Sequence, residues 1–238
     1  MATHARRALW HARPGVTHCR ARDIVRPTGG IVRGKFPSRK NGRMVHHEGL
    51  LELDAIYLFE LSPHIAGYRE QPLTIFYPDK GRMRRYTPDF ELTLDTAETV
   101  LVEVKPRHSL EQPDVMHKLT CLREHFQRAG TRFVVLDDVV LRAEPRQSNA
   151  RWIYHRAPRV TPTADAAQAA IERYRDLFPA TVRAAQVLLA EAGMEPFSLL
   201  LAGLLHGQSP EPLSLETVLH VSKEAHDGWL RITQEHGF

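Results

Sequence analysis

The spacing of apolar residues divides the chain into an N-terminal half of mixed elements and a C-terminal half of short helices. Residues 47–61 carry apolar side chains over about two faces, which predicts a well-buried helix that ends at the following Ser-Pro-His. Three stretches have the pattern of strands, at 68–77, 84–94 and 99–105, and a polar turn joins the last two.

The next two elements complete the predicted core. Residues 113–128 repeat apolar side chains at helical spacing, with Pro113 near the start and Gly130 just beyond the end. A short apolar strand follows at 132–138. The order helix, three strands, helix, strand predicts an α/β core over residues 45–150, preceded by an arm at 1–44.

From about residue 150 the pattern becomes helical, and we assign 151–238 to a separate C-terminal domain. Proline and glycine divide three predicted short helices, at 163–178, 179–193 and 196–207. Ser214 is suited to cap a fourth at 214–230, and 156–163 has the composition of a linker.

Composition favours a soluble globular protein of the cytoplasm. The chain has 238 residues, 42% of them hydrophobic, and a mean hydropathy of −0.35. No stretch approaches the length of a membrane span, and the basic N-terminus has no apolar region of the kind found in secretory signals. Cys19 and Cys121 are too few for a disulfide framework or a zinc site made mainly of thiolates.

Positive charge is concentrated in the arm. Residues 1–44 hold eleven Arg and Lys against one acid, a net charge of +10 in a chain whose total is +4. Such a segment is typical of a nucleic-acid contact, and the alternative is a solvated tail. The residues that we predict to contact DNA are Arg26, Arg33, Lys35, Arg39, Lys40 and Arg43.

The stretch RYTPDFELTLDTAETVLVEVKP, residues 85–106, holds the candidate chemistry. Side chains two residues apart share one face of a strand, so Glu103 and Lys105 point the same way, and Asp89 approaches them if the neighbouring strands pair. Crowded carboxylates disfavour joint ionisation, and Mg²⁺ or Mn²⁺ relieves that repulsion. Such an ion activates water for phosphodiester cleavage, while the lysine orients or deprotonates the water or neutralises the phosphate.

Pro-Asp followed after fourteen residues by Glu-x-Lys is the signature of the PD-(D/E)xK nuclease superfamily. The residues that carry it are Pro88, Asp89, Glu103 and Lys105. The predicted element order matches the restriction-endonuclease-like core of that superfamily, an α-β-β-β-α-β arrangement with a mixed sheet. The alternative is a salt-bridge ladder on the surface of a sheet.

A longer resemblance covers residues 20–140. Three stretches of it closely resemble the TnsA family of endonuclease subunits of heteromeric, Tn7-like transposases. They are RPTGGIVRGKFPSRKNGRMVHHEGLLELDAIYLFELSPHIAGYREQP, RYTPDFEL and VLVEVKP. The resemblance implies that Glu52, in LLELDAIYLFELSP, completes a metal site with Asp89 and Glu103, beside Lys105. Leu53 and Ala55 depart from the family pattern, and neither removes a ligand.

The resemblance also implies a function and partners. A Mg²⁺- or Mn²⁺-dependent endonuclease, with one or two ions per site, cuts the strand carrying the 5′ end in double-stranded DNA at transposon ends. A DDE-type transposase cuts and joins the 3′ ends, and an AAA+ ATPase regulates both. The C-terminal region loosely resembles a winged-helix-like domain, and the expected location is the bacterial cytoplasm, at the nucleoid. The alternatives are a stand-alone restriction-like or repair nuclease and a non-catalytic DNA-binding scaffold.

Several neighbouring residues stay open as lesser candidates. Glu48 precedes Glu52 by one helical turn and is an alternative ligand. His46 and His47 could contact metal or phosphate, although surface or capping roles are more common for isolated histidines. Gln71 could assist near the metal, and a hydrogen-bonding role in the fold is the other reading.

Overall fold

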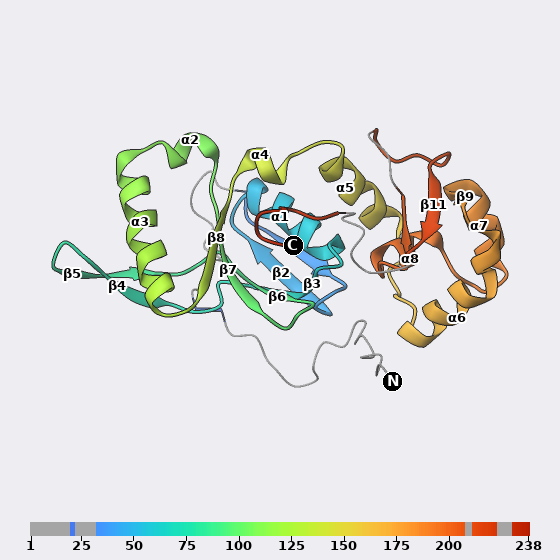
Figure 1. Cartoon of the computed structure of the whole chain (residues 1–238), viewed down its shortest axis with the longest axis horizontal. Coiled ribbons are helices and arrows are strands. Elements are labelled where there is room, and N and C mark those ends of the chain that lie inside the picture. Colours follow the sequence, from blue (N-terminus) through green and yellow to red (C-terminus); the bar gives the residue numbers. More distant parts are fainter. Residues whose placement is uncertain (1–19, 22–31, 208–210, 223–229) are drawn as a thin grey trace.

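The computed structural model of the protein describes residues 20–21, 32–207, 211–222 and 230–238. Figure 1 shows an elongated molecule with a central sheet, a long hairpin at one end and a cluster of helices at the other. The elements in chain order are β1 (Gly34–Ser38), β2 (Arg43–His47), α1 (Leu50–Leu61), β3 (Ile65–Glu70), β4 (Ile75–Asp79), β5 (Arg82–Tyr86), β6 (Phe90–Leu94), β7 (Thr99–Val104), α2 (Arg107–Leu110), α3 (Pro113–Arg128), β8 (Arg132–Leu136), α4 (Asp138–Leu141), α5 (Arg146–Arg156), α6 (Ala164–Tyr174), a 3-10 turn (Arg175–Leu177), β9 (Ala180–Thr181), α7 (Val182–Ala190), α8 (Pro196–Leu201), β10 (Leu205–His206) and β11 (Val218–Val221).

The central sheet has the strand order β3-β6-β7-β8, so the α/β class predicted from the sequence is observed with a mixed sheet. β3, β6 and β7 pair antiparallel, and β8 joins β7 in parallel. Along β7 the side chains alternate as a strand requires. Val102 belongs to the larger hydrophobic core, which includes α1, whereas Leu101 belongs to a smaller core that includes α3. Glu103 has the parity of Leu101 and therefore lies on the α3 face of the sheet.

Two of the predicted strands are each broken into two. Residues 68–77 divide into β3 and β4, and residues 84–94 divide into β5 and β6. At the first break Gln71 adopts a positive φ of 44° and Pro72 follows, so the extended ladder cannot continue. The Gln71 amide donates to the Asp89 carbonyl oxygen at 2.8 Å, which joins the two breaks. The separated halves β4 and β5 pair with each other as a projecting hairpin (Figure 1).

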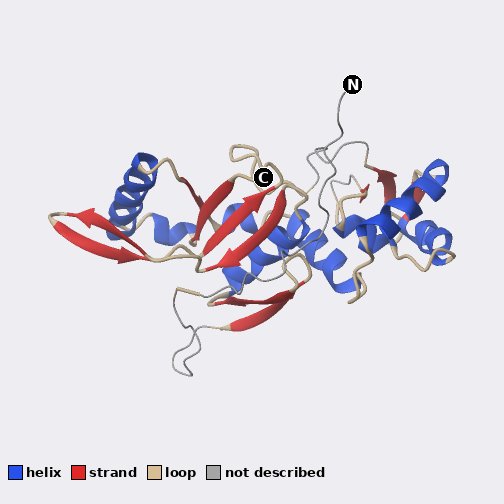
Figure 2. Ribbon diagram, turned by 90° about the horizontal axis from the view of Figure 1, so that it is seen from below, coloured by secondary structure: helices blue, strands red, loops and turns tan. Residues whose placement is uncertain are grey.

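The end of the predicted arm is part of the folded core. β1 and β2 pair antiparallel, and their inward residues Phe36 and Val45 are buried in the larger core. Figure 2 shows this hairpin as a separate ribbon, with α1 between it and the central sheet. The boundary predicted after residue 44 therefore falls inside β2. The basic residues of this segment, such as Lys35 on β1 and Arg43 on β2, make the two inward apolar positions hard to recognise in the sequence.

The C-terminal half departs from the prediction most at α5 and at the predicted fourth helix, and the short strands β9 and β10 were not predicted either. α5 was not predicted; it packs against both α1 and α8, so the boundary placed at residue 151 falls inside a helix. In the predicted fourth helix, Val218–Val221 is a strand, β11, which lies between β9 and β10 in a small sheet. The β-branched residues at both ends of β11 suit an extended backbone.

The last residues return to the first half of the chain. Ile232 and Phe238 are buried in the larger core, and Arg146 donates to the carbonyl oxygens of Arg231 and Ile232 at 2.9 and 2.7 Å. Arg231 Nη2 also lies 3.5 Å from His64 Nε2, just beyond the end of α1. Residues 151–238 thus contain a helical unit and a terminal segment that packs on the first half of the chain. In the ranges that the structure describes, no helix is long and apolar enough to cross a membrane.

Candidate active site

Three backbone elements position the four residues that the sequence selected. Glu52 lies in the first turn of α1, and Asp89 lies in the short segment that separates β5 from β6. Glu103 is the penultimate residue of β7, and Lys105 follows the end of that strand. The parallel ladder continues past the strand, since the Lys105 amide donates to the Leu136 carbonyl oxygen at 3.0 Å. The strand period therefore sets Glu103 and Lys105 on the same side.

Glu103 is the most enclosed of the four, with a residue exposure of 2%. Its Oε2 accepts a hydrogen bond from the Tyr86 hydroxyl at 2.6 Å. Its Oε1 faces two ammonium groups, Lys105 Nζ at 3.2 Å and Lys118 Nζ at 3.6 Å. Both carboxylate oxygens are thus held by donors, which is the satisfaction that a buried charge requires.

Sequence reasoning missed Tyr86 and Lys118. Burial and the neighbouring Glu103 raise the pKa of the Tyr86 hydroxyl, so this group remains a hydrogen-bond donor. Lys118 lies on α3, and its Nζ is 4.7 Å from the centre of the Tyr86 ring. Neither residue belongs to the linear motif, because the contacts with Glu103 arise only when α3 and the β4–β5 hairpin fold against β7.

Asp89 and Glu52 are held beside like charges. Burial, then Glu103 and Glu52, raise the pKa of Asp89 well above its ordinary value, although the Val104 amide donates to Asp89 Oδ2 at 2.8 Å. Burial raises the pKa of Glu52 to about 7, and repulsion from Glu48 and Glu103 adds to this. Three carboxylates therefore repel one another within a small volume, which a bound cation would relieve.

Lys105 opposes that repulsion. Burial lowers its pKa, but attraction to Glu103, Asp89 and Glu52 outweighs the burial, so the net pKa is raised. The Lys105 side chain is 32% exposed, so it can reach both Glu103 and solvent. A permanently protonated lysine beside a carboxylate cluster is suited to contact an anionic substrate.

The oxygen donors of these carboxylates fit a hard divalent cation. However, their oxygen atoms do not all lie within 4.8 Å of one another. In the described part of the chain, the one group of three His, Cys, Asp or Glu whose ligand atoms all lie within 4.8 Å of one another is elsewhere, at Asp79, His117 and Cys121. Mg²⁺ commonly retains several waters and takes one or two carboxylates directly. Direct ligation by all three carboxylates is therefore not required for them to serve such an ion.

The lesser candidates border this site. Glu48 Oε1 accepts a hydrogen bond from Gln71 Nε2 at 3.1 Å, and the Glu48 amide donates to Glu52 Oε2 at 2.7 Å. Gln71 Oε1 is buried and has no hydrogen-bond partner among the residues that the structure describes. His47 Nδ1 lies 3.1 Å from the Gly49 carbonyl oxygen, which is a contact at the start of α1.

Two of the residues predicted to contact DNA have their donors committed to the fold. Arg39 donates to the carbonyl oxygens of Tyr154 and Ala157 at 3.0 and 2.9 Å. Lys40 Nζ donates to those of Phe59 and Ser62 at 2.7 and 2.8 Å, which satisfies carbonyl groups at the end of α1. These two side chains hold the hairpin against α1 and α5 rather than presenting free charge.

The other predicted DNA contacts differ among themselves. Arg43 forms a bidentate pair with Glu70, at 3.0 and 2.7 Å, so it too is internally paired. Lys35 is exposed on β1, and Arg33 is half-buried. Arg26 lies outside the described residues. A count of basic residues overestimates the charge available to DNA because it cannot identify the cations that bond within the fold.

The raised pKa of Glu52 gives a pH-dependent prediction. Its folded pKa of about 7 exceeds the ordinary value of 4.5, so between these values the folded state binds more protons and its stability falls as pH rises. We expect Glu52→Gln to stabilise the metal-free protein at pH 8 by more than at pH 5. Urea unfolding of both proteins with a chelator present measures this, and an equal difference at the two pH values would contradict it.

Comparison with known proteins relates this site to a family. Residues 62–138 match the family model described as TnsA-like endonuclease N terminal, and this range contains Asp89, Glu103 and Lys105. Glu52 lies before the matched range, so its assignment to the site rests on the local sequence pattern around α1. No curated protein matches the chain. The chain thus carries a domain of the TnsA-like endonuclease family.

Proposed function

We propose that this protein is a Mg²⁺- or Mn²⁺-dependent DNA endonuclease that cuts the strand carrying the 5′ end at transposon ends, within a heteromeric cut-and-paste transposase. The domain match indicates a nuclease of the Tn7 TnsA type. Metal dependence and the cleavage role are proposed on one observation: Glu52, Asp89 and Glu103 lie close enough to repel one another, and Lys105 lies beside them. Such repulsion is costly unless the residues serve a charged ligand.

The carboxylates have the chemistry to hold the cation. Glu52, Asp89 and Glu103 supply hard oxygen donors, and a divalent ion bound there supplies Lewis-acid stabilisation of a phosphodiester and a more acidic water. Because the pKa values of Asp89 and Glu52 are raised, cation binding would release any proton that these acids hold.

The remaining polar groups bind and orient. The raised pKa of Lys105 favours its ammonium form, so we assign it to orienting the water and neutralising the scissile phosphate rather than to removing a proton. Tyr86 and Lys118 hold the Glu103 carboxylate from the side facing α3. These contacts restrict the rotation of Glu103, and a fixed ligand keeps the cation and the phosphate in register.

Element order supports the fold-level part of the proposal. α1, β3, β6, β7, α3 and β8 follow one another in the α-β-β-β-α-β sequence of a restriction-endonuclease-like core, with β4–β5 inserted as a hairpin. In the C-terminal half, the succession α6, β9, α7, α8, β10, β11 supports the proposal of a winged-helix-like domain. Fold analogy raises the expectation of nuclease function but does not define the substrate.

The charge of the C-terminal half favours dependence on partners. Residues 151–238 hold eight Arg and Lys against ten Asp and Glu, a net charge of −2, unlike a typical independent DNA reader. Contacts with phosphates position a protein without specifying sequence. We therefore propose that a DDE-type transposase supplies recognition of the transposon ends, and that an AAA+ ATPase regulates the assembly.

The test is strand-specific cleavage with and without the partner. Purified protein is incubated in Mg²⁺ with a plasmid carrying the cognate ends, alone and with the transposase. We expect little cleavage by the chain alone, and nicks in the strand carrying the 5′ end near the transposon ends when the transposase is present. End-labelling of each strand locates the nicks.

If the protein is instead a stand-alone nuclease, the opposite result is expected. Efficient cutting at a defined sequence by the chain alone would replace the transposon proposal with a stand-alone restriction-like nuclease. Absence of cleavage in the complete mixture, with Mg²⁺ or Mn²⁺, would instead favour a DNA-binding scaffold.

A further inference from the structure

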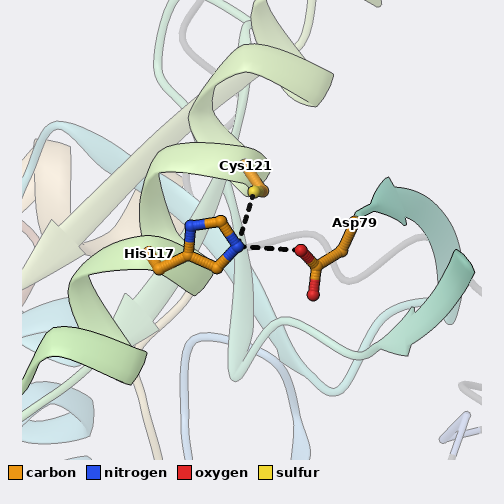
Figure 3. Close-up of side chains that lie close together, drawn as sticks. All are labelled: Asp79, His117 and Cys121. Atoms are coloured by element: carbon orange, nitrogen blue, oxygen red, sulfur yellow. Dashed lines mark hydrogen bonds and ion pairs between the residues drawn. The ribbon is translucent and has the colours of Figure 1, made fainter. Parts of the chain in front are cut away.

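A second cluster of potential metal ligands lies between the projecting hairpin and α3. Asp79 is the last residue of β4, while His117 and Cys121 lie one turn apart on α3 and share one face of that helix. Figure 3 shows the three side chains pointing toward a common centre. Their ligand atoms all lie within 4.8 Å of one another. None of the three takes part in the candidate nuclease site.

The geometry is that of a ligand set rather than of a catalytic triad. Asp79 Oδ1 lies 2.8 Å from His117 Nε2, and Cys121 Sγ lies 3.7 Å from the same nitrogen. A triad needs the two ring nitrogens to serve different partners, one the nucleophile and the other the carboxylate. Here the oxygen and the sulfur both approach Nε2, as Figure 3 shows, so no proton relay passes through the imidazole.

We propose that Asp79, His117 and Cys121 form a zinc site that joins the β4–β5 hairpin to α3. Thiolate, imidazole and carboxylate are the protein ligands of Zn²⁺, whereas a sulfur donor is a poor ligand for Mg²⁺. Tetrahedral coordination at ordinary Zn²⁺ bond lengths separates nitrogen and sulfur by roughly 3.5 Å and nitrogen and oxygen by roughly 3.4 Å. The observed nitrogen–sulfur distance is already close, and the nitrogen–oxygen distance must open by about half an ångström.

The surroundings of the cluster favour ion binding. Arg84 Nε contacts Asp79 Oδ2 at 3.2 Å, which orients the carboxylate while Oδ1 faces the histidine. The Asp79 side chain is 12% exposed and that of His117 is 45% exposed, so solvent ions can reach the centre. Three protein ligands leave a fourth position for water.

The proposed site is connected to the nuclease site through the two elements that carry its ligands, α3 and the β4–β5 hairpin. His117 precedes Lys118 on α3, and Lys118 Nζ lies 3.6 Å from Glu103 Oε1. The hairpin that carries Asp79 also carries Tyr86, which donates to Glu103 Oε2. Zinc would fix both elements that hold Glu103. The site is thus a positioning site, and its ion differs in class from the one proposed for the carboxylates.

The decisive experiment measures binding, so it does not depend on nuclease activity. The full chain with Cys19→Ser serves as parent, since Cys121 is then the one remaining cysteine. After chelator treatment, Zn²⁺ is titrated, and Co²⁺ is used as a spectroscopic probe of thiolate ligation. We expect one Zn²⁺ per chain, a thiolate-to-cobalt charge-transfer band, and slower alkylation of Cys121 when Zn²⁺ is present.

Variants separate ligation from general effects. Cys121→Ser should abolish the charge-transfer band. Cys121→Ser and His117→Gln should each weaken Zn²⁺ binding by more than the roughly 10–100-fold cost of losing an outer-shell partner. His125→Gln, also on α3 but outside the cluster, is the matched control and should bind as the parent does. The proposal is overturned if the parent binds no Zn²⁺ at micromolar concentrations, or if Cys121→Ser binds it equally well.

Discussion

Replacing Asp89 with Ala is expected to reduce Mg²⁺-dependent strand cleavage by at least about a thousandfold. The reason is that cation stabilisation of the transition state contributes several kcal/mol, and each 1.4 kcal/mol is about tenfold in rate. Asp89 lies in the segment between β5 and β6, where the Val104 amide fixes one of its oxygens and burial, together with the other carboxylates, raises its pKa. Single-turnover cleavage of end-labelled transposon DNA by the complete assembly measures the rate.

A matched control separates chemistry from folding. Glu91 is two residues away on β6 and forms a partly exposed pair with Arg69, at 2.9 and 3.0 Å. Glu91→Gln should keep the parent rate, because exposed pairs contribute little to stability and this one is remote from the proposed chemistry. Asp89→Ala should also unfold near the parent temperature. Cleavage by Asp89→Ala at the parent rate, in the same Mg²⁺, would refute the assignment of the site.

Local periodicity predicted the elements that depend on local interactions. The helix predicted at 113–128 is observed with those bounds as α3, because its apolar spacing and Pro113 act within one segment. The same strand period placed Glu103 and Lys105 on one side of the sheet. The broken strands could not be predicted in this way, since the break depends on the Gln71 amide reaching the Asp89 carbonyl oxygen across the fold.

Tertiary contacts account for the rest of the site. Tyr86 and Lys118 reach Glu103 from a hairpin and a helix that lie 17 residues before it and 15 after it, and no linear spacing indicates this. In the basic segment, the sequence instead predicted contacts that the fold does not leave available. Arg39 and Lys40 look like DNA contacts in the sequence, yet backbone carbonyl groups of α1 and α5 bind their donors. The net charge of a segment does not reveal such internal partners.

The same segment binds one buried acid, Glu60, which is 0% exposed at the end of α1. Its Oε1 accepts hydrogen bonds from the Arg39 and Lys40 amides at 2.6 and 2.8 Å. Its Oε2 accepts from the hydroxyls of Ser38 and Tyr68 at 2.8 and 2.7 Å. One carboxylate thus joins the β1–β2 hairpin, α1 and β3.

Glu60→Ala is therefore expected to destabilise the protein by about 3–5 kcal/mol, because it leaves four donors without their acceptor in a buried site. The midpoint of urea unfolding should fall by at least about 1 M. The control is Glu216→Ala, which removes an exposed pair with Arg183, both side chains being more than 60% exposed, and should cost at most about 1 kcal/mol. If Glu60→Ala unfolds at the same urea concentration as Glu216→Ala, Glu60 does not anchor the hairpin, and the segment before α1 behaves as the independent arm that its charge suggested.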